Sequence, residues 1–209
     1  MIDIDKFDKL LKRVEKPARY IGMEKNAIKK DLDQVRVKFA FAFPDIYEVG
    51  MSHLGLHILY NLINDKEDFA CERVFAPWVD MEKEMIKENV PLFTLENREP
   101  IKNFDFIGFT LQYEMSYTNI INMLNLGDVP ILSKDRNEDD PFIIAGGPCA
   151  YNPEPIADII DFFVIGEGEE VTLEILDKYK ETKGNRLDFL KEVSKIEGVY
   201  VPSFYQVHY

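Results

Sequence analysis

Two short apolar runs, each closed by a glycine turn, constrain the fold of this chain more than any other feature of its sequence. The runs are residues 142–145 (FIIA) and 162–165 (FFVI), and the turns are Gly146-Gly147-Pro148 and Gly166-Glu167-Gly168-Glu169. Residues 154–160, between the runs, are compatible with a helix. Continuous apolar runs separated by a helical stretch are typical of buried parallel strands. Ligands bind such sheets just beyond the carboxyl ends of the strands, where both turns are expected. Taken alone, either turn is equally well explained as a tight connection between strand and helix.

The same succession of strand and helix extends through most of the chain. Apolar runs predict further strands at residues 35–43, 70–75, 91–95 and 104–110. Amphipathic stretches predict helices after residue 52 and over residues 79–89, 117–126, 169–179 and 186–194. This alternation predicts a doubly wound α/β domain with a mostly parallel sheet.

The pattern divides the chain into three parts. Residues 1–33 form an N-terminal helical arm, residues 34–182 the doubly wound domain, and residues 183–209 a small α+β tail with one helix and a strand pair. The arm places apolar residues at helical spacing and stops at Pro17; these residues are Phe7, Leu10, Leu11 and Val14.

Two helix boundaries follow from residue type. Ser52 is the expected N-cap of the helix after the first strand. The apolar stripe of that helix is predicted to comprise Leu54, Ile58, Leu59 and Leu62. Gly127 is expected to close the helix at 117–126 as its C′ residue.

The charge balance excludes one class of partner. Acidic residues outnumber basic ones 38 to 25, which gives a formal net charge of -13. Because phosphate-binding surfaces depend on clustered Lys and Arg, we expect no direct contact with nucleic acid. No apolar run approaches the roughly 20 residues that span a bilayer, and the acidic N-terminus is unlike a signal peptide. The sequence therefore predicts a cytoplasmic protein with no membrane association.

The chain has two cysteines, Cys71 and Cys149, far apart in sequence and beside apolar runs. This placement favours small buried thiols over a disulfide. Two cysteines also cannot supply a Cys-rich metal or iron–sulfur motif.

Four loops are predicted to converge on the carboxyl edge of the sheet, namely residues 44–53, 110–117, 146–153 and 166–169. Besides glycines they carry hydroxyls, an amide and carboxylates, which suit a large polar ligand with an apolar body. The polar residues are Asp45, Tyr47, Glu48, Ser52, Thr110, Gln112, Tyr113, Glu114, Ser116, Glu167 and Glu169.

No familiar catalytic motif is present, since the chain lacks GxGxxG, a P-loop lysine motif and G-x-S-x-G. His53 and His57 have the i, i+4 spacing of paired metal ligands, but Leu54 stands where H-E-x-x-H requires Glu. We expect His53 to face the cleft and His57 to pack or face solvent, without a metal. Glu167 and Glu169 suit acid–base chemistry, but fixing a turn and its helix explains them as well.

Several stretches together resemble a known family: FPDIYEVGMSHLGLHILYNLIN, ERVFAPWVDME, PLFTLE, FDFIGFTLQYEMSYTNIINML, IIAGGPCAYNPEPIAD and FFVIGEGEE. In this order they resemble the N-terminal region of B12-binding-domain-containing radical SAM proteins, in which a cobalamin-binding-like domain precedes a radical SAM domain. The likeness extends from about Pro17 to the Tyr205-Gln206-Val207 tail. It implies a flavodoxin-like, Rossmann-like fold.

The resemblance also implies a site. In such proteins cobalamin lies across the carboxyl edge of the sheet and faces a neighbouring barrel. By resemblance, Gly146, Gly147 and Pro148, together with the GEGE turn of Gly166, Glu167, Gly168 and Glu169, line the nucleotide-tail side. The loops containing Thr110, Gln112 and Tyr113, and Tyr47, Ser52 and His53, approach the corrin.

Two departures from the family pattern shape these expectations. Histidine ligation of cobalt resembles D-x-H-x-x-G, but Met51 and Leu56 flank His53 and Gly55 precedes His57 at the corresponding positions. The resemblance therefore implies cobalamin with its base displaced and no protein histidine in its place.

The second departure is the missing Cys-x-x-x-Cys-x-x-Cys motif of radical SAM enzymes. We expect the [4Fe-4S] cluster and S-adenosylmethionine only on a radical SAM barrel, supplied in cis or in trans. The chain is then a fragment, a truncated product or half of a split system, and is inactive alone.

The leading hypothesis is a cobalamin-binding or cobalamin-binding-derived module of a radical SAM enzyme. The rival is a cofactor-free docking domain that supports the barrel or recruits a substrate. A flavin or nucleotide binder has less support, because no phosphate-cradling motif follows the first strand. The binding hypothesis requires an open, glycine-floored groove, whereas the docking hypothesis predicts a groove filled by Tyr47, Met51, Tyr113 or Met115.

Overall fold

A six-stranded sheet forms the centre of the protein, with the strand order β2-β1-β3-β4-β5-β6. The computed structural model describes residues 2–182 and 185–206. Strands β1 to β5 are mutually parallel, and β6 pairs with β5 in the antiparallel direction. The order 2-1-3-4-5 is that of flavodoxin-like doubly wound sheets, so the predicted α/β fold is confirmed. The strands are β1 (Val37–Phe43), β2 (Phe69–Phe75), β3 (Phe106–Thr110), β4 (Phe142–Gly146), β5 (Phe162–Val164) and β6 (Val199–Tyr200).

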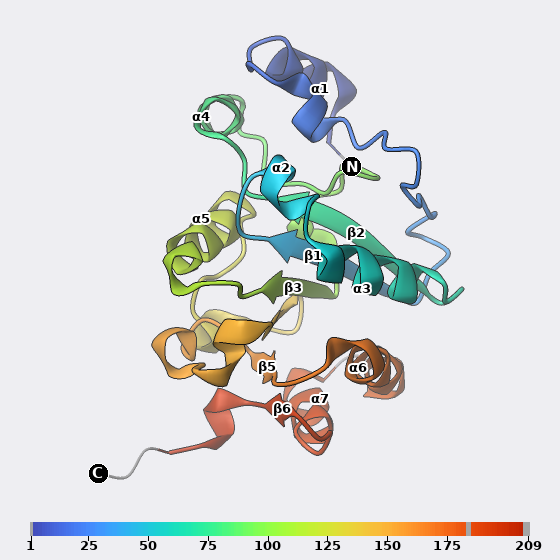
Figure 1. Cartoon of the computed structure of the whole chain (residues 1–209), viewed down its shortest axis with the longest axis vertical. Coiled ribbons are helices and arrows are strands. Elements are labelled where there is room, and N and C mark those ends of the chain that lie inside the picture. The colour runs from blue at the N-terminus through green and yellow to red at the C-terminus, as the bar shows by residue number, and fades with distance from the viewer. Residues whose placement is uncertain (1, 183–184, 207–209) are drawn as a thin grey trace.

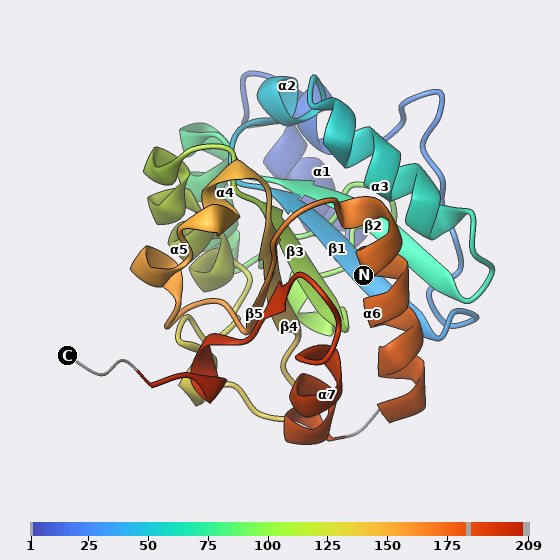
Figure 2. The same ribbon diagram turned by 60° about the horizontal axis from the view of Figure 1, so that its bottom comes forward.

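Helices cover both faces of this sheet (Figures 1 and 2). The helices on one face are α1 (Ile4–Leu11), α4 (Val79–Glu88) and α5 (Tyr117–Leu126). Those on the other are α3 (Leu54–Asn64), α6 (Gly168–Thr182) and α7 (Arg186–Val193). Alternation along β1 sends Ala40 and Ala42 to the first face and Phe39, Phe41 and Phe43 to the second. The bulky face is the one that borders the candidate site.

An aromatic cluster fixes α7 to the second face. The ring of Phe189 lies 4.7 Å from Phe142, 5.7 Å from Phe106 and 5.2 Å from Tyr179, measured between centroids. Phe106, Phe162 and Phe189 are completely buried. The C-terminal helix is thus part of the same core as the sheet.

The N-terminal arm is less helical than expected. Helix α1 ends at Leu11, and a short 3-10 helix covers Pro17–Tyr20. We call the irregular residues 21–36 the strap, because hydrogen bonds attach them beside the edge strand β2. The Glu24 carboxylate accepts a bond from Arg73 (2.8 Å), and the Tyr60 hydroxyl accepts one from the Ile28 amide (2.6 Å). An edge strand covered in this way is protected from pairing with another chain.

Two predicted elements differ from the structure. Residues 91–95 form no strand, because their backbone amides bond separately to Leu126, Glu99 and Arg73 and build no ladder. Residues 154–160 contain only the short 3-10 helix Glu154–Ile156.

The capping of α3 and α5 differs from the prediction, whereas α5 itself spans Tyr117–Leu126 as predicted. His53, not Ser52, caps α3, and its buried stripe contains Leu56 and Ile63, whereas Leu54 is 70% exposed. Gly127 has a φ of -86°, and its lack of a side chain makes room for Ile101.

In the tail, β6 adds to the main sheet beside β5, and the 3-10 helix Pro202–Phe204 follows it where a second strand was expected. The end of that predicted strand pair, residues 207–209, lies outside the described residues. Among the described helices, none is long and apolar enough to cross a membrane.

The aromatic cluster makes a prediction about stability. We expect Phe189→Ala to lower the free energy of unfolding by about 3–5 kcal/mol, because it leaves a cavity among rings that cannot collapse onto one another. Urea denaturation followed by circular dichroism measures the change. Leu187→Ala, on the same helix but 53% exposed, is the matched control and should change stability by less than about 0.5 kcal/mol. Equal effects of the two substitutions would contradict the packing of α7 described above.

Candidate functional site

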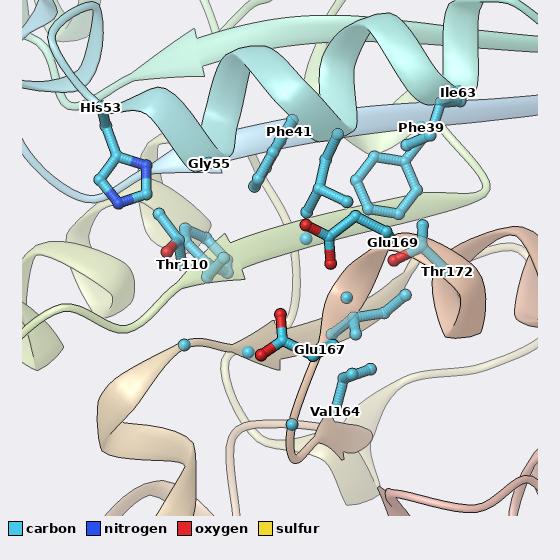
Figure 3. Close-up of a pocket in the computed structure, with 18 of the residues that line it drawn as sticks. Phe39, Phe41, His53, Gly55, Ile63, Thr110, Val164, Glu167, Glu169 and Thr172 are labelled. Carbon is cyan, nitrogen blue, oxygen red and sulfur yellow. The ribbon is translucent and has the colours of Figure 1, made fainter.

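A groove opens at the carboxyl edge of the parallel strands, between α3 and the start of α6 (Figure 3). Its cavity has a volume of about 220 Å³. The polar side chains and the turn glycines that line it come from the loops after β1, β3, β4 and β5, as the sequence predicted for a ligand site. They are His53, Thr110, Gln112, Gly146, Gly147, Gly166, Glu167, Gly168 and Glu169.

The floor of the groove depends on a glycine within the sheet. A Cβ on Gly108 of β3 would lie 2.4 Å from the Phe39 ring, so any side chain at this position would clash with the ring. Phe39, Phe41, Ile144 and Val164 then give the groove an apolar floor. The register of the strands pairs Phe41 with Gly108 and Gly108 with Ile144, which brings these residues side by side.

The turn glycines keep the mouth of the groove open. Gly166 has a φ of +115°, and a Cβ there would meet nothing within 4 Å. Gly147 has a φ of +102°, and a Cβ would approach the Leu111 carbonyl to 3.0 Å. Both conformations are rare for residues with side chains, so these two turns require glycine.

His53 has a defined orientation at one end of the groove. Its Nδ1 accepts a hydrogen bond from the Leu56 amide at 3.1 Å, and its ring lies 5.3 Å from that of Phe43. A Cβ on Gly55 would lie 3.0 Å from the imidazole, so Gly55 provides the space for the ring. Because Nδ1 is an acceptor, the proton of the neutral ring resides on Nε2. His53 therefore presents an N–H donor.

His57 makes no pair with His53. Its Nε2 donates to the Met51 carbonyl at 2.8 Å, so it stabilises the turn before α3. No group of three or more His, Cys, Asp or Glu suited to a metal ion occurs among residues 2–182 and 185–206.

The remaining polar groups of the groove differ in how far they are satisfied. The Gln112 amide donates to the Thr110 hydroxyl at 2.6 Å. In the described part of the chain, no hydrogen bond or ion pair engages the carboxylate of Glu167 or Glu169. Figure 3 shows both carboxylates directed into the space below α3.

Four residues predicted for the site lie outside the groove lining. Tyr47, on the short helix α2 (Tyr47–Gly50), packs on Phe75 and donates to Glu24 of the strap at 2.7 Å. Burial and this carboxylate raise the pKa of Tyr47 to about 12. Ser52 donates to the Glu48 carbonyl, and Pro148 begins a 3-10 helix.

Tyr113 lies at the edge of the sheet beyond the groove. Its hydroxyl donates to Asp45 at 3.2 Å, and the charge of Asp45 raises the pKa of Tyr113. Tyr113 thus joins the loops after β1 and β3, while its ring stays 44% exposed.

Sequence reasoning missed part of the lining. Gly55, Leu59 and Ile63 of α3, and Thr172 of α6, face the groove. The first three are spaced by four residues, which is a helical stripe that a different choice of phase would have found. The apolar strand residues gave no separate signal, because both faces of a parallel strand are apolar.

Comparison with known proteins assigns a family. Residues 55–202 match the family model for radical SAM proteins, N-terminal. This chain belongs to that family. A curated relative, the uncharacterized protein MJ0966 of Methanocaldococcus jannaschii, is 31% identical over 166 residues. The alignment covers 77% of this chain and 31% of that protein, so the chain spans about a third of its relative. No solved structure matches.

The tautomer of His53 is open to direct measurement. We expect Nδ1 of the neutral His53 ring to show the shift of an unprotonated nitrogen. Long-range ¹H–¹⁵N correlation spectra measure this, and a His57→Gln variant assigns the signals. Gly55→Ala should perturb the His53 signals, because the added methyl group displaces the ring. A proton on Nδ1 would contradict the capping bond.

Proposed function

We propose that this chain is a cobalamin-binding, or cobalamin-binding-derived, N-terminal module of a radical SAM enzyme. The observation that carries the proposal is an open groove with an apolar floor and glycines at its mouth, at the carboxyl edge of a flavodoxin-like sheet in a chain of the radical SAM N-terminal family. Ligands of doubly wound sheets bind at this edge. The module would hold a corrinoid toward a partner barrel that carries a [4Fe-4S] cluster and S-adenosylmethionine.

The residues of the groove fit part of such a ligand. A cavity of about 220 Å³ is smaller than the roughly 300–1,000 Å³ of complete small-molecule sites. It would accept one arm of a corrinoid, with the macrocycle over the edge of the sheet. The apolar floor suits the hydrocarbon part of such an arm, and the hydroxyl, amide and N–H groups around it suit polar substituents.

The filling residues expected of an empty docking domain are absent from the groove lining. Tyr47 packs against Phe75, and the Met51 sulfur lies 3.2 Å from Arg73 Nη1, away from the groove. Met115 is 84% exposed, and Tyr113 lies outside the groove. This arrangement favours binding over filling.

The chemistry of His53 argues against histidine ligation of a bound corrinoid. A nitrogen that ligates cobalt must offer a lone pair, whereas Nε2 of His53 carries the proton while Nδ1 caps α3. Ligation would cost the capping bond, for which no acidic partner on Nδ1 compensates in the described chain. A bound corrinoid would supply the organometallic chemistry, and this chain would supply binding, orientation and exclusion of water.

One observation favours the alternative of a cofactor-free docking domain. Apolar side chains stand exposed around the carboxyl edge, among them Val79 at 58%, Leu54 at 70% and Met115 at 84%. A docking partner at this edge would bury these side chains. The exposed edge suits a partner barrel whether or not a corrinoid lies between them.

A titration with hydroxocobalamin, followed by desalting, tests the proposal. We expect retained corrinoid with the visible spectrum of a displaced base and no histidine nitrogen on cobalt. A histidine-ligated spectrum would refute the role given to His53. Loss of all corrinoid on desalting would favour the docking domain.

A substitution locates the site. Gly146→Leu should weaken corrinoid binding about 10- to 100-fold, because its side chain would enter the groove and overpacking typically costs 1–3 kcal/mol. Gly146 tolerates a Cβ, whose nearest neighbour is the Val164 carbonyl at 3.5 Å, so the fold should persist. Asn152→Leu, an exposed position on the same β4–β5 connection, is the control. Equal corrinoid affinity of the two variants would contradict the placement of the site in this groove.

A further inference from the structure

The charge of the groove is one-sided. Its lining contains Glu167 and Glu169 and no Lys or Arg, and this holds for every described residue that borders the cavity. Further acids, Glu170 and Glu174, lie just outside on α6. An anionic group inside the groove would therefore meet like charge with no cation to offset it.

The two carboxylates have capacity to bind a ligand. Most other buried or half-buried acids near the sheet are engaged, as Glu24 and Glu96 are by Arg73 and Asp161 is by Arg136. Glu167 and Glu169 have no such partner within the described residues. Glu167 is exposed and Glu169 half-buried, so water can reach both in the free groove. A carboxylate only accepts hydrogen bonds, so a ligand that displaces this water has to offer N–H or O–H donors.

His53 supplies the opposite function in the same groove. Its Nε2–H is a donor that the capping bond on Nδ1 keeps in place. A ligand group that satisfies both the histidine and the glutamates must both donate and accept while carrying no negative charge. A primary carboxamide has these properties, since it offers two N–H donors and a carbonyl oxygen.

We infer that Glu167 and Glu169 make this groove selective for a ligand edge that carries carboxamides. The same two side chains would disfavour an edge that carries carboxylates or phosphates. The inference rests on the proposed function, because corrinoids in their amidated form carry a periphery of primary carboxamides. The two glutamates are then specificity-determining residues. A carboxamide arm would then occupy the groove in place of the nucleotide tail that the resemblance implies there, because the tail carries an anionic phosphodiester. Flavin or nucleotide phosphates would be excluded from the same position.

The test uses the 209-residue chain with hydroxocobalamin and its monocarboxylates, in which one peripheral carboxamide at a time is hydrolysed to a carboxylate. Equilibrium dialysis with visible absorption gives each dissociation constant. We expect at least one monocarboxylate to bind about tenfold or more weakly than the parent, since a hydrogen bond to a charged group is replaced by repulsion. The nucleotide tail is identical throughout the series, so it does not affect the comparison.

The variant Glu167→Gln with Glu169→Gln should abolish that discrimination. Glutamine keeps the size of the side chain and can donate to a carboxylate, so the affinity ratio of parent to monocarboxylate should fall by about tenfold. The matched control is Glu170→Gln with Glu174→Gln, which removes the same charge from the same segment outside the groove. The control should leave the ratio unchanged.

The outcomes separate this inference from the proposed function. Tight binding of hydroxocobalamin with an unchanged ratio in the groove variant would overturn the selectivity and leave the corrinoid module intact. An equal change in the control variant would likewise overturn it, in favour of general charge repulsion. Failure of the wild-type chain to bind hydroxocobalamin at all would overturn the proposed function and this inference with it.

Discussion

The structure depends on the need to cover a parallel sheet on both faces. Its strands are apolar on each side, and burying such surface contributes roughly 25 cal/mol for each Å² removed from water. Helices α1, α4 and α5 cover the face where Ala40 and Ala42 allow close approach. Helices α3, α6 and α7 cover the face with Phe39, Phe41 and Phe43. At the carboxyl edge, α3 and α6 leave a gap over that second face, and the groove is this gap.

A buried ion network on the opposite side of α3 keeps the groove open. Arg73 of β2 is 3% exposed and bonds to Glu96 at 2.6 Å and to Glu24 of the strap at 2.8 Å. Although burial opposes its charge, the two carboxylates raise the pKa of Arg73 above its ordinary value. Glu24 in turn accepts the Tyr47 hydroxyl, and Arg73 contacts the Met51 sulfur. The network therefore holds these large side chains away from the sheet edge, where they would otherwise compete with a ligand.

The parts of the site that sequence predicted are those in which residue type and backbone conformation agree. Gly147 and Gly166 require positive φ values, and their position after apolar strands indicated the carboxyl edge. Thr110 and Glu169 followed from the same reasoning about strand ends. These residues line the groove as expected, while their role in holding a cofactor stays a prediction.

The site residues that were misplaced or missed depend on side-chain directions, which the periodicity of a sequence does not determine. Tyr47 and Ser52 lie in the predicted loop, but neither side chain faces the groove. Tyr47 donates to Glu24 of the strap, and Ser52 donates to the Glu48 carbonyl in α2. The phase of α3 was wrong because its sequence is apolar on more than one face, so packing on Phe41 and Phe43 selects the buried side. The need for glycine at position 108 was also not predictable from local sequence. It arises from the ring of Phe39, sixty-nine residues earlier in the chain, and not from a turn.

The groove and the exposed apolar edge are best understood as one surface. A cavity of about 220 Å³ would enclose only part of the proposed corrinoid, so a second surface would be needed to cover the remainder. Leu54 adjoins the lining residue His53, Met115 lies in the loop after β3, and both are exposed. A second surface at this edge would bury them. Burial of both would couple ligand binding to docking, because each provides apolar area for the other. If a barrel docks here as proposed, the affinity of the chain alone is a lower limit for that of the assembled protein.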